Sequence, residues 1–168
     1  MDAIENLLTR RSIRKFKTEE VPRETLEKII ECAKASPTGM NKQERLFTVV
    51  TKDEDIQRLA AAIAKSLDRD DYYIYNAKAL IIITVPEDLK LGDADTSTAM
   101  ENIYLASHAL GIASVWINQL RGNKDDGVRE VLTSFKIPEN HISYGMMALG
   151  YADEVPKAKE RTEKVVYL

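Results

Sequence analysis

Five cations crowd into one short stretch of this sequence, TRRSIRKFK, at residues 9–17. Arginine and lysine side chains donate charge-assisted hydrogen bonds, and arginine matches a phosphate or carboxylate with paired donors. Ser12 adds a hydroxyl, while Ile13 and Phe16 are apolar and would anchor the backbone in the core. The stretch therefore predicts a held cradle for an anion such as a phosphate. Its cations are Arg10, Arg11, Arg14, Lys15 and Lys17.

Two other interpretations of this stretch remain open. A basic run is commonly a solvated surface with no ligand, although the interleaved apolar residues argue against that here. A nucleic-acid patch would need further basic residues or stacking aromatics along one face. The segment that follows, TEEVPRETLEK at residues 18–28, is acidic instead, and the net charge of the chain is -3. We therefore expect no nucleic-acid partner.

Motifs for other chemistries are missing. The sequence has no G-x-G-x-x-G after a strand, no G-x-x-x-x-G-K-[ST] and no G-x-S-x-G, which argues against a Rossmann site, a Walker loop and a nucleophile elbow. A single cysteine, Cys32, rules out an intrachain disulfide, and His108 and His141 are far apart in sequence, so no metal site is predicted. The segment GDADTS at residues 92–97 lacks the later ligands of a metal loop and predicts helix caps.

Length and composition predict an ordinary globular protein. The 168 residues are 44% hydrophobic and 30% charged, and no stretch resembles a linker, so we expect one domain over residues 1–168. The longest apolar run, ALIIITV at residues 79–85, is far shorter than the roughly 20 residues needed to cross a bilayer. The start, MDAIENLL, lacks the basic and apolar regions of an export signal, so we expect a cytoplasmic protein with no membrane partner.

The elements that must position the basic stretch alternate between helices and apolar strands. Strands are predicted at residues 46–51, 79–85, 113–118 and 144–151. Five helices are predicted, and they begin near Asp2, Pro22, Asp53, Asp93 or Asp95, and Asp125. The aspartates at residues 2, 53 and 93 or 95 are predicted to cap their helices, and Gly111 is predicted to end the fourth helix. Cys32 would be a small buried filler on the second helix. The pattern predicts an α+β or α/β sandwich with a sheet covered on both faces.

The tail from Asp153 to Leu168 lacks clean periodicity but ends in VVYL, a run of strand formers. A monomer would leave that run poorly covered. Because a second copy of the chain can offer a sheet edge, the tail hints at a dimer that exchanges its C-termini.

Several motifs together resemble one family. RRSIRKF, followed after one helix by SPTGMNKQ, is similar to the paired signature of the nitroreductase family of flavin-dependent oxidoreductases, R-R-S-x-R-x-[FY] and then [AS]-P-[ST]-x-x-N-x-Q. MENIYLASHALGIASVWINQL resembles the family's central helix and following strand, YGMMALGY its last core strand, and KAKERTEKVV its C-terminal K-x-R. The resemblance covers nearly the whole chain, in order.

The resemblance implies an α+β fold, a nitroreductase-like three-layer sandwich whose mostly antiparallel sheet is flanked by helices and whose C-terminal tail is exchanged in a homodimer. It also implies FMN, bound at the interface of that homodimer, with NADH or NADPH as electron donor. By match of motif, the cofactor-binding residues would be Arg10, Arg11, Ser12, Arg14, Pro37, Thr38, Gly39, Asn41, Asn118, Gln119, Lys159 and Arg161.

The implied roles differ within that set. Residues 10–12, with Lys159 and Arg161, would hold the phosphate and ribityl chain. Arg14 would face the pyrimidine edge of the flavin ring, where a fixed cation raises the reduction potential. Residues 37–41 would reach the flavin from the partner subunit, and the backbone at residues 118–119 would approach N5, the atom that takes and gives the hydride. The cofactor then performs the redox step, so no catalytic side chain is implied.

The implied function is an FMN-dependent oxidoreductase that uses NAD(P)H to reduce a small planar acceptor, such as a nitroaromatic or quinone, by a ping-pong mechanism. Two departures leave the acceptor open: the chain has Glu44-Arg45 where many relatives have Pro-Trp, and it lacks the insertion that covers the pocket in larger members. A non-catalytic FMN-binding protein for storage or sensing, and a family branch with different flavin chemistry, remain as alternatives.

Overall fold

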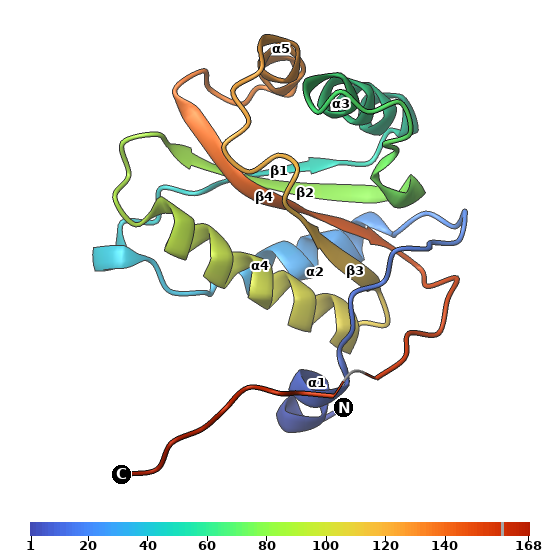
Figure 1. Cartoon of the computed structure of the whole chain (residues 1–168), viewed down its shortest axis with the longest axis vertical. Coiled ribbons are helices and arrows are strands. Elements are labelled where there is room, and N and C mark those ends of the chain that lie inside the picture. The colour runs from blue at the N-terminus through green and yellow to red at the C-terminus, as the bar shows by residue number, and fades with distance from the viewer. Residues whose placement is uncertain (159) are drawn as a thin grey trace.

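An antiparallel sheet forms the middle layer of the molecule (Figure 1). The computed structural model describes residues 1–158 and 160–168. The sheet has the strand order β1-β2-β4-β3, and every neighbouring pair is antiparallel. This arrangement confirms the α+β class that the resemblance implied, whereas the apolar pattern alone left α/β open. The strands are β1 (Leu46–Val50), β2 (Ala79–Pro86), β3 (Ala113–Ile117) and β4 (His141–Gly150).

Helices cover both faces of the sheet, as Figure 1 shows. On one face lie α3 (Asp53–Ser66) and α5 (Asp126–Ser134), and on the other lie α2 (Arg23–Lys34) and α4 (Gly92–Ala109). Strand β2 divides its side chains between them, since neighbouring residues of a strand point to opposite faces. Leu80 and Ile82 join the α3–α5 cluster, while Ile81 and Ile83 join the α2–α4 cluster. The result is a three-layer sandwich with two cores.

Helix α4 is the element against which the remaining segments are arranged. Its 18 residues include Met100 and Ile103, which are fully buried against the sheet, and Tyr104, which is buried nearer its C-terminal end. It contacts α2 and the short helix α1 (Ala3–Thr9) on its other sides. Two single-turn 3-10 helices complete the fold, η1 (Gly39–Asn41) and η2 (Ile74–Asn76).

Some helix ends follow the predicted chemistry. The Asp2 carboxylate accepts hydrogen bonds from the backbone N–H groups of Ile4 and Glu5, both at 2.9 Å, and so caps α1. Gly111, just past the end of α4, has a φ of 74°, the left-handed conformation that glycine adopts without steric cost. Both local predictions are therefore confirmed.

Three other local predictions are wrong. Asp53 is the first residue of α3 rather than its cap. Helix α4 begins at Gly92, so Asp93 and Asp95 lie inside its first turn, where negative charge interacts favourably with the helix dipole without capping it. Cys32 is exposed rather than buried, because the core-facing side of α2 is the one that carries Leu26, Ile29 and Ala33.

Two apolar segments stay on the surface. Helix α1 has no buried residue and exposes Ile4, Leu7 and Leu8 at 65%, 52% and 69%. The VVYL run, residues 165–168, is exposed and belongs to no strand of this chain. Exchange of this tail in a homodimer stays a prediction. Within the described ranges, none of the helices is long and apolar enough to cross a membrane.

Candidate functional site

The basic stretch is held in place by its backbone. After α1 the chain is extended, and Ser12 pairs with Ser114 of β3 while the Ile13 N–H donates to the Ser114 carbonyl at 3.0 Å. Further on, the Lys17 N–H donates to the Tyr151 carbonyl at 2.9 Å. Ile13 and Phe16 are 6% and 9% exposed, so the predicted anchors are confirmed. Main-chain pairing to two neighbouring segments leaves the cationic side chains to project from a fixed frame.

Tyr104 of α4 joins this stretch to β3. Its hydroxyl lies 3.0 Å from Ser12 Oγ and accepts a hydrogen bond from the Trp116 N–H at 2.6 Å. The Arg10 guanidinium lies over the Tyr104 ring, 4.2 Å from its centroid, in a cation–π contact. One aromatic side chain therefore sets the positions of Arg10 and Ser12 relative to the sheet.

The cations of the stretch have different surroundings. Arg10 Nε is buried, lies 3.9 Å from Glu101 Oε1, and has no hydrogen-bond partner among the described residues. Arg11 turns back and donates through Nη1 to the carbonyls of Leu8 (2.8 Å) and Arg10 (2.7 Å), near the C-terminal end of α1. The Arg14 side chain is exposed, and its backbone N–H donates to Glu154 Oε1 at 2.5 Å. Of these three arginines, Arg10 is therefore the one with a buried donor that has no hydrogen-bond partner among the described residues.

Sequence reasoning missed three residues of this cluster. Glu101, Tyr104 and His108 lie three and four positions apart on α4, so they share one face of the helix, and that spacing was the available signal. His108 Nε2 lies 3.0 Å from Thr9 Oγ1. Burial lowers the pKa of His108, and the nearby Arg10 and Arg11 charges lower it further. The helix therefore supplies a second layer of polar groups behind the basic stretch.

Residues 37–41 lie elsewhere, beside the first turns of α4. The Gly39 N–H donates to Asp95 Oδ1 at 2.8 Å, and Thr98 Oγ1 donates to the Pro37 carbonyl at 3.2 Å. Thr38 is half-buried, while Pro37, Met40 and Asn41 are exposed. At about 1.5 Å per residue, Asp95 and Tyr104 are about 13 Å apart along the axis of α4. A single chain therefore holds this segment and the basic stretch at separate places on one helix.

Asn118 and Gln119 form the turn directly after β3. The Arg121 N–H donates to the Asn118 carbonyl at 2.7 Å, and Asn118 is exposed while Gln119 is half-buried. The Arg121 guanidinium binds Asp93 of α4 through two hydrogen bonds, at 2.7 and 3.0 Å, and these bonds hold the pKa of Asp93 below its usual value. The turn is thus tied to the same end of α4 as residues 37–41.

Two residues of the predicted set belong to the C-terminal tail. Arg161 is exposed in the extended C-terminal segment. Lys159 lies outside the described residues.

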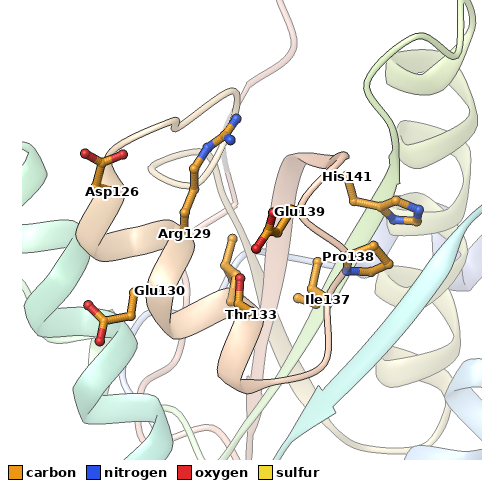
Figure 2. A pocket seen from close by; sticks show the side chains of 9 residues that line it. Asp126, Arg129, Glu130, Thr133, Ile137, Pro138, Glu139 and His141 are labelled. Carbon is orange, nitrogen blue, oxygen red and sulfur yellow. The ribbon is translucent and has the colours of Figure 1, made fainter.

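Two hollows on the surface of the described residues are not lined by the predicted site residues. One, of about 400 Å³, lies between α5 and the turn before β4, with Arg129, Glu139 and His141 among its lining residues (Figure 2). The other lies between α2 and the edge strand β1, with Leu26, Ile30 and Val49 among its lining residues. Among the described residues, no group of acidic, histidine and cysteine side chains is arranged to hold a metal ion.

Comparisons with known proteins give a consistent result. The model of the nitroreductase family matches residues 7–151. The structure superimposes on a nitroreductase with bound FMN from Bacteroides fragilis with a TM-score of 0.85 and 35% identity, over 98% of this chain and 96% of that chain. A protein of Methanothermobacter thermautotrophicus, provisionally named NADH dehydrogenase/NAD(P)H nitroreductase, is 30% identical over 95% of this chain and 82% of its own length. An NADPH-flavin oxidoreductase of Vibrio harveyi is 27% identical, over 95% and 70%.

Proposed function

The chain belongs to the nitroreductase family, and from this membership we propose that it is a homodimeric, FMN-dependent oxidoreductase that uses NADH or NADPH to reduce a small planar acceptor. When bound, FMN would supply the redox chemistry for hydride transfer from the nucleotide and for reduction of an acceptor such as a nitroaromatic or quinone in a ping-pong cycle. The chain's own residues bind the cofactor, orient it and set its electrostatic surroundings.

The observation that carries this proposal is the environment of Arg10. Its Nε is a buried donor without a hydrogen-bond partner among the described residues, 3.9 Å from the Glu101 carboxylate. The Arg10 guanidinium and the Ser12 hydroxyl both contact Tyr104, on a backbone that β3 holds in place. A buried donor without a partner costs stability, so the site favours a ligand that supplies an acceptor. A phosphate oxygen is such an acceptor, and its hydrogen bonds to arginine are charge-assisted. The residues present therefore fit the phosphate of FMN.

The other predicted residues take supporting roles in the proposal. Arg11 and Ser12 add donors for the phosphate and ribityl chain, and Lys159 and Arg161 join them from the tail. Arg14 is exposed and would approach the pyrimidine edge of the ring. Backbone groups at Asn118 and Gln119 would lie near flavin N5.

The position of residues 37–41 supports a homodimer. This segment exposes Pro37 and Asn41 but is about 13 Å along α4 from the basic stretch of its own chain. A second copy could bring its own residues 37–41 to that stretch. The exposed apolar side of α1, with Ile4, Leu7 and Leu8, would be covered in the same assembly. We propose that residues 1–168 form one FMN-binding domain whose tail is exchanged between protomers.

The first experiment is the visible absorbance spectrum of the purified protein, followed by anaerobic addition of NADH and NADPH in separate samples. We expect flavin bands that bleach with at least one nucleotide and recover when a nitroaromatic or quinone is added. Bands that persist with both nucleotides would favour flavin storage or sensing. A protein that stays colourless after incubation with FMN would overturn the proposal.

The second experiment tests the phosphate cradle. Arg10→Ala should weaken FMN binding by about 1.5–3 kcal/mol, the range for hydrogen bonds to charged groups, which is about 10- to 150-fold in Kd. Arg10→Lys, which keeps the positive charge but lacks Nε, should have an FMN affinity between those of Arg10→Ala and the parent protein. Lys15→Ala is the matched control, because Lys15 is an exposed cation of the same stretch that pairs with Asp153 at 3.4 Å. Equal affinities for all four proteins would remove Arg10 from the site.

A further inference from the structure

The GDADTS segment opens α4, but its aspartates do not cap the helix. Leu91 occupies the N-cap position, and Asp93 and Asp95 lie in the first turn. Each carboxylate is used for a tertiary contact instead. Asp95 accepts from the Gly39 N–H at 2.8 Å, and Asp93 binds Arg121 at 2.7 and 3.0 Å. Two separate loops therefore meet at one helical turn.

Of these two contacts, the one that Asp95 makes is the stronger because Asp95 is buried, with only 4% of its surface exposed. Its Oδ2 has no hydrogen-bond partner among the described residues, so the carboxylate is retained in the core at a cost in stability. Arg45 compensates part of that cost, because its positive charge interacts with the Asp95 carboxylate. Its guanidinium donates to the Asp95 carbonyl at 3.0 Å and to Ser36 Oγ and the Ser36 carbonyl at 2.6 and 3.0 Å. Asp95 and Arg45 thus hold residues 36–39 from both sides.

Packing adds a further constraint on the same segment. A Cβ at Gly39 would lie 2.4 Å from Leu91 Cδ1, so the backbone of this loop rests directly on the residue before α4. Thr98, one turn after Asp95, has a hydroxyl that lies within donating distance of two carbonyls, Pro37 at 3.2 Å and Asp95 at 3.0 Å. By contrast, the first turn of α4 holds the loop after β3 through one exposed ion pair, since the Asp93 and Arg121 side chains are 50% and 43% exposed. That loop is also held from β4, because the Gly122 N–H donates to the Ser143 carbonyl at 2.8 Å.

We propose that the first turn of α4 is the positioning element of the flavin site. Asp95 holds residues 36–39, and Asp93 holds the loop at residues 118–121. The first turn of α4 therefore sets the positions of these two loops relative to each other. The proposal rests on the proposed function, because those loops are the ones assigned to FMN. If residues 36–41 serve the flavin of the partner subunit, this turn also stands between the two sites of the dimer. Arg45 then supports the same loop through its hydrogen bonds to Ser36 and to the Asp95 carbonyl.

The test measures amide hydrogen exchange in the full-length protein, with and without FMN, and FMN affinity by fluorescence titration. Asp95→Ala should abolish protection of the Gly39 amide and weaken FMN binding at least about tenfold, because it removes a hydrogen-bonded charged group. Asp95→Asn keeps an acceptor for that N–H and should restore both. Asp93→Ala should increase exchange only at residues 118–122 and weaken FMN binding by up to about fivefold, the scale of an exposed ion pair.

Two further variants keep the test decisive. If Asp95→Ala fails to fold, Thr98→Val removes a single hydrogen bond to the same loop and should raise exchange there to a smaller extent. Asp55→Asn is the matched control, since Asp55 pairs with Arg58 within α3, on the face of the sheet opposite α4, and should leave FMN affinity unchanged. Unchanged exchange at residues 36–41 in both Asp95→Ala and Thr98→Val would overturn the positioning role. Raised exchange with unchanged FMN affinity would instead show that Asp95 and Thr98 do not act on the flavin site. Absence of FMN binding in the parent protein would overturn the proposed function, while the exchange result would still test the contacts between α4 and the loop.

Discussion

The two segments assigned to the flavin are held in opposite ways. The basic stretch, residues 10–17, is fixed by main-chain pairing to Ser114 and Tyr151 and by two buried anchors. Residues 36–41 are fixed mainly by side chains of other elements, above all Asp95 and Arg45. Main-chain pairing tolerates most substitutions, because every residue except proline supplies the same backbone groups. A loop held by side chains can be released by a single substitution, and the two segments should therefore respond differently to mutation.

The largest loss of stability is expected from a substitution in β4 that disturbs the packing of the basic stretch. A Cβ at Gly150 of β4 would lie 2.9 Å from Phe16 Cδ1 and 3.1 Å from both Phe16 Cβ and Cγ, and atoms so near the backbone cannot move far. Gly150→Ala should therefore destabilise the protein by about 2–3 kcal/mol, within the range for overpacked cores. Urea unfolding measures this cost. A cost below that of Gly39→Ala would show that Phe16 packs no more tightly on β4 than the loop at residues 36–41 packs on Leu91.

The next effect should come from Tyr104. Tyr104→Phe keeps the ring under Arg10 but removes the hydroxyl that Ser12 Oγ and the Trp116 N–H approach. We expect a loss of about 1–2 kcal/mol in the free energy of unfolding, since a partly buried N–H is left without its acceptor. Ser12→Ala should cost less, because it leaves that N–H paired. Equal costs for the two variants would show that the Trp116 contact contributes nothing.

Gly39→Ala should have a smaller effect on stability. Its nearest obstacle is Leu91 Cδ1, the far end of a flexible side chain that is 48% exposed and can rotate away. Leu91 Cβ, at 3.2 Å, cannot rotate away but is a looser contact than Phe16 makes at Gly150, so we expect a cost of about 1 kcal/mol. Adding Leu91→Ala should recover that cost in the double mutant, which a double-mutant cycle in urea would measure. Additive costs would mean that the loop does not rest on Leu91.

The smallest effect should be a pH dependence confined to the basic region. The pKa of His108 is lowered in the folded protein by burial and by Arg10 and Arg11, so the unfolded chain binds the proton more readily. Stability from this group is present above its unfolded pKa of about 6.5 and is lost as pH falls below that value. His108→Gln should flatten the dependence between about pH 7.5 and 5.5, apart from the share of His141, whose pKa is also lowered by burial. An unchanged slope would show that His108 is not the group responsible.

Local chemistry was readable from the sequence wherever a residue acts on its own neighbours. The caps at Asp2 and Gly111, the anchors Ile13 and Phe16, and the positions of the strands follow from side-chain type and spacing. The aspartates at residues 53, 93 and 95 were misassigned, because an acidic residue near a helix start is equally favourable at the cap or in the first turn. Tertiary contacts decided between those positions for Asp93 and Asp95.

The sequence by itself determined the family, the antiparallel three-layer fold that the family implies, and the cationic stretch that marks the proposed site, because these depend on motifs and periodicities along the chain. Only the tertiary structure decided that Tyr104 joins this stretch to β3, that Arg10 Nε is a buried donor without a partner among the described residues, and that Asp93 and Asp95 hold two loops. Those contacts join residues far apart in the chain. Their partners are set by the packing of α4 on the sheet, which no local pattern specifies.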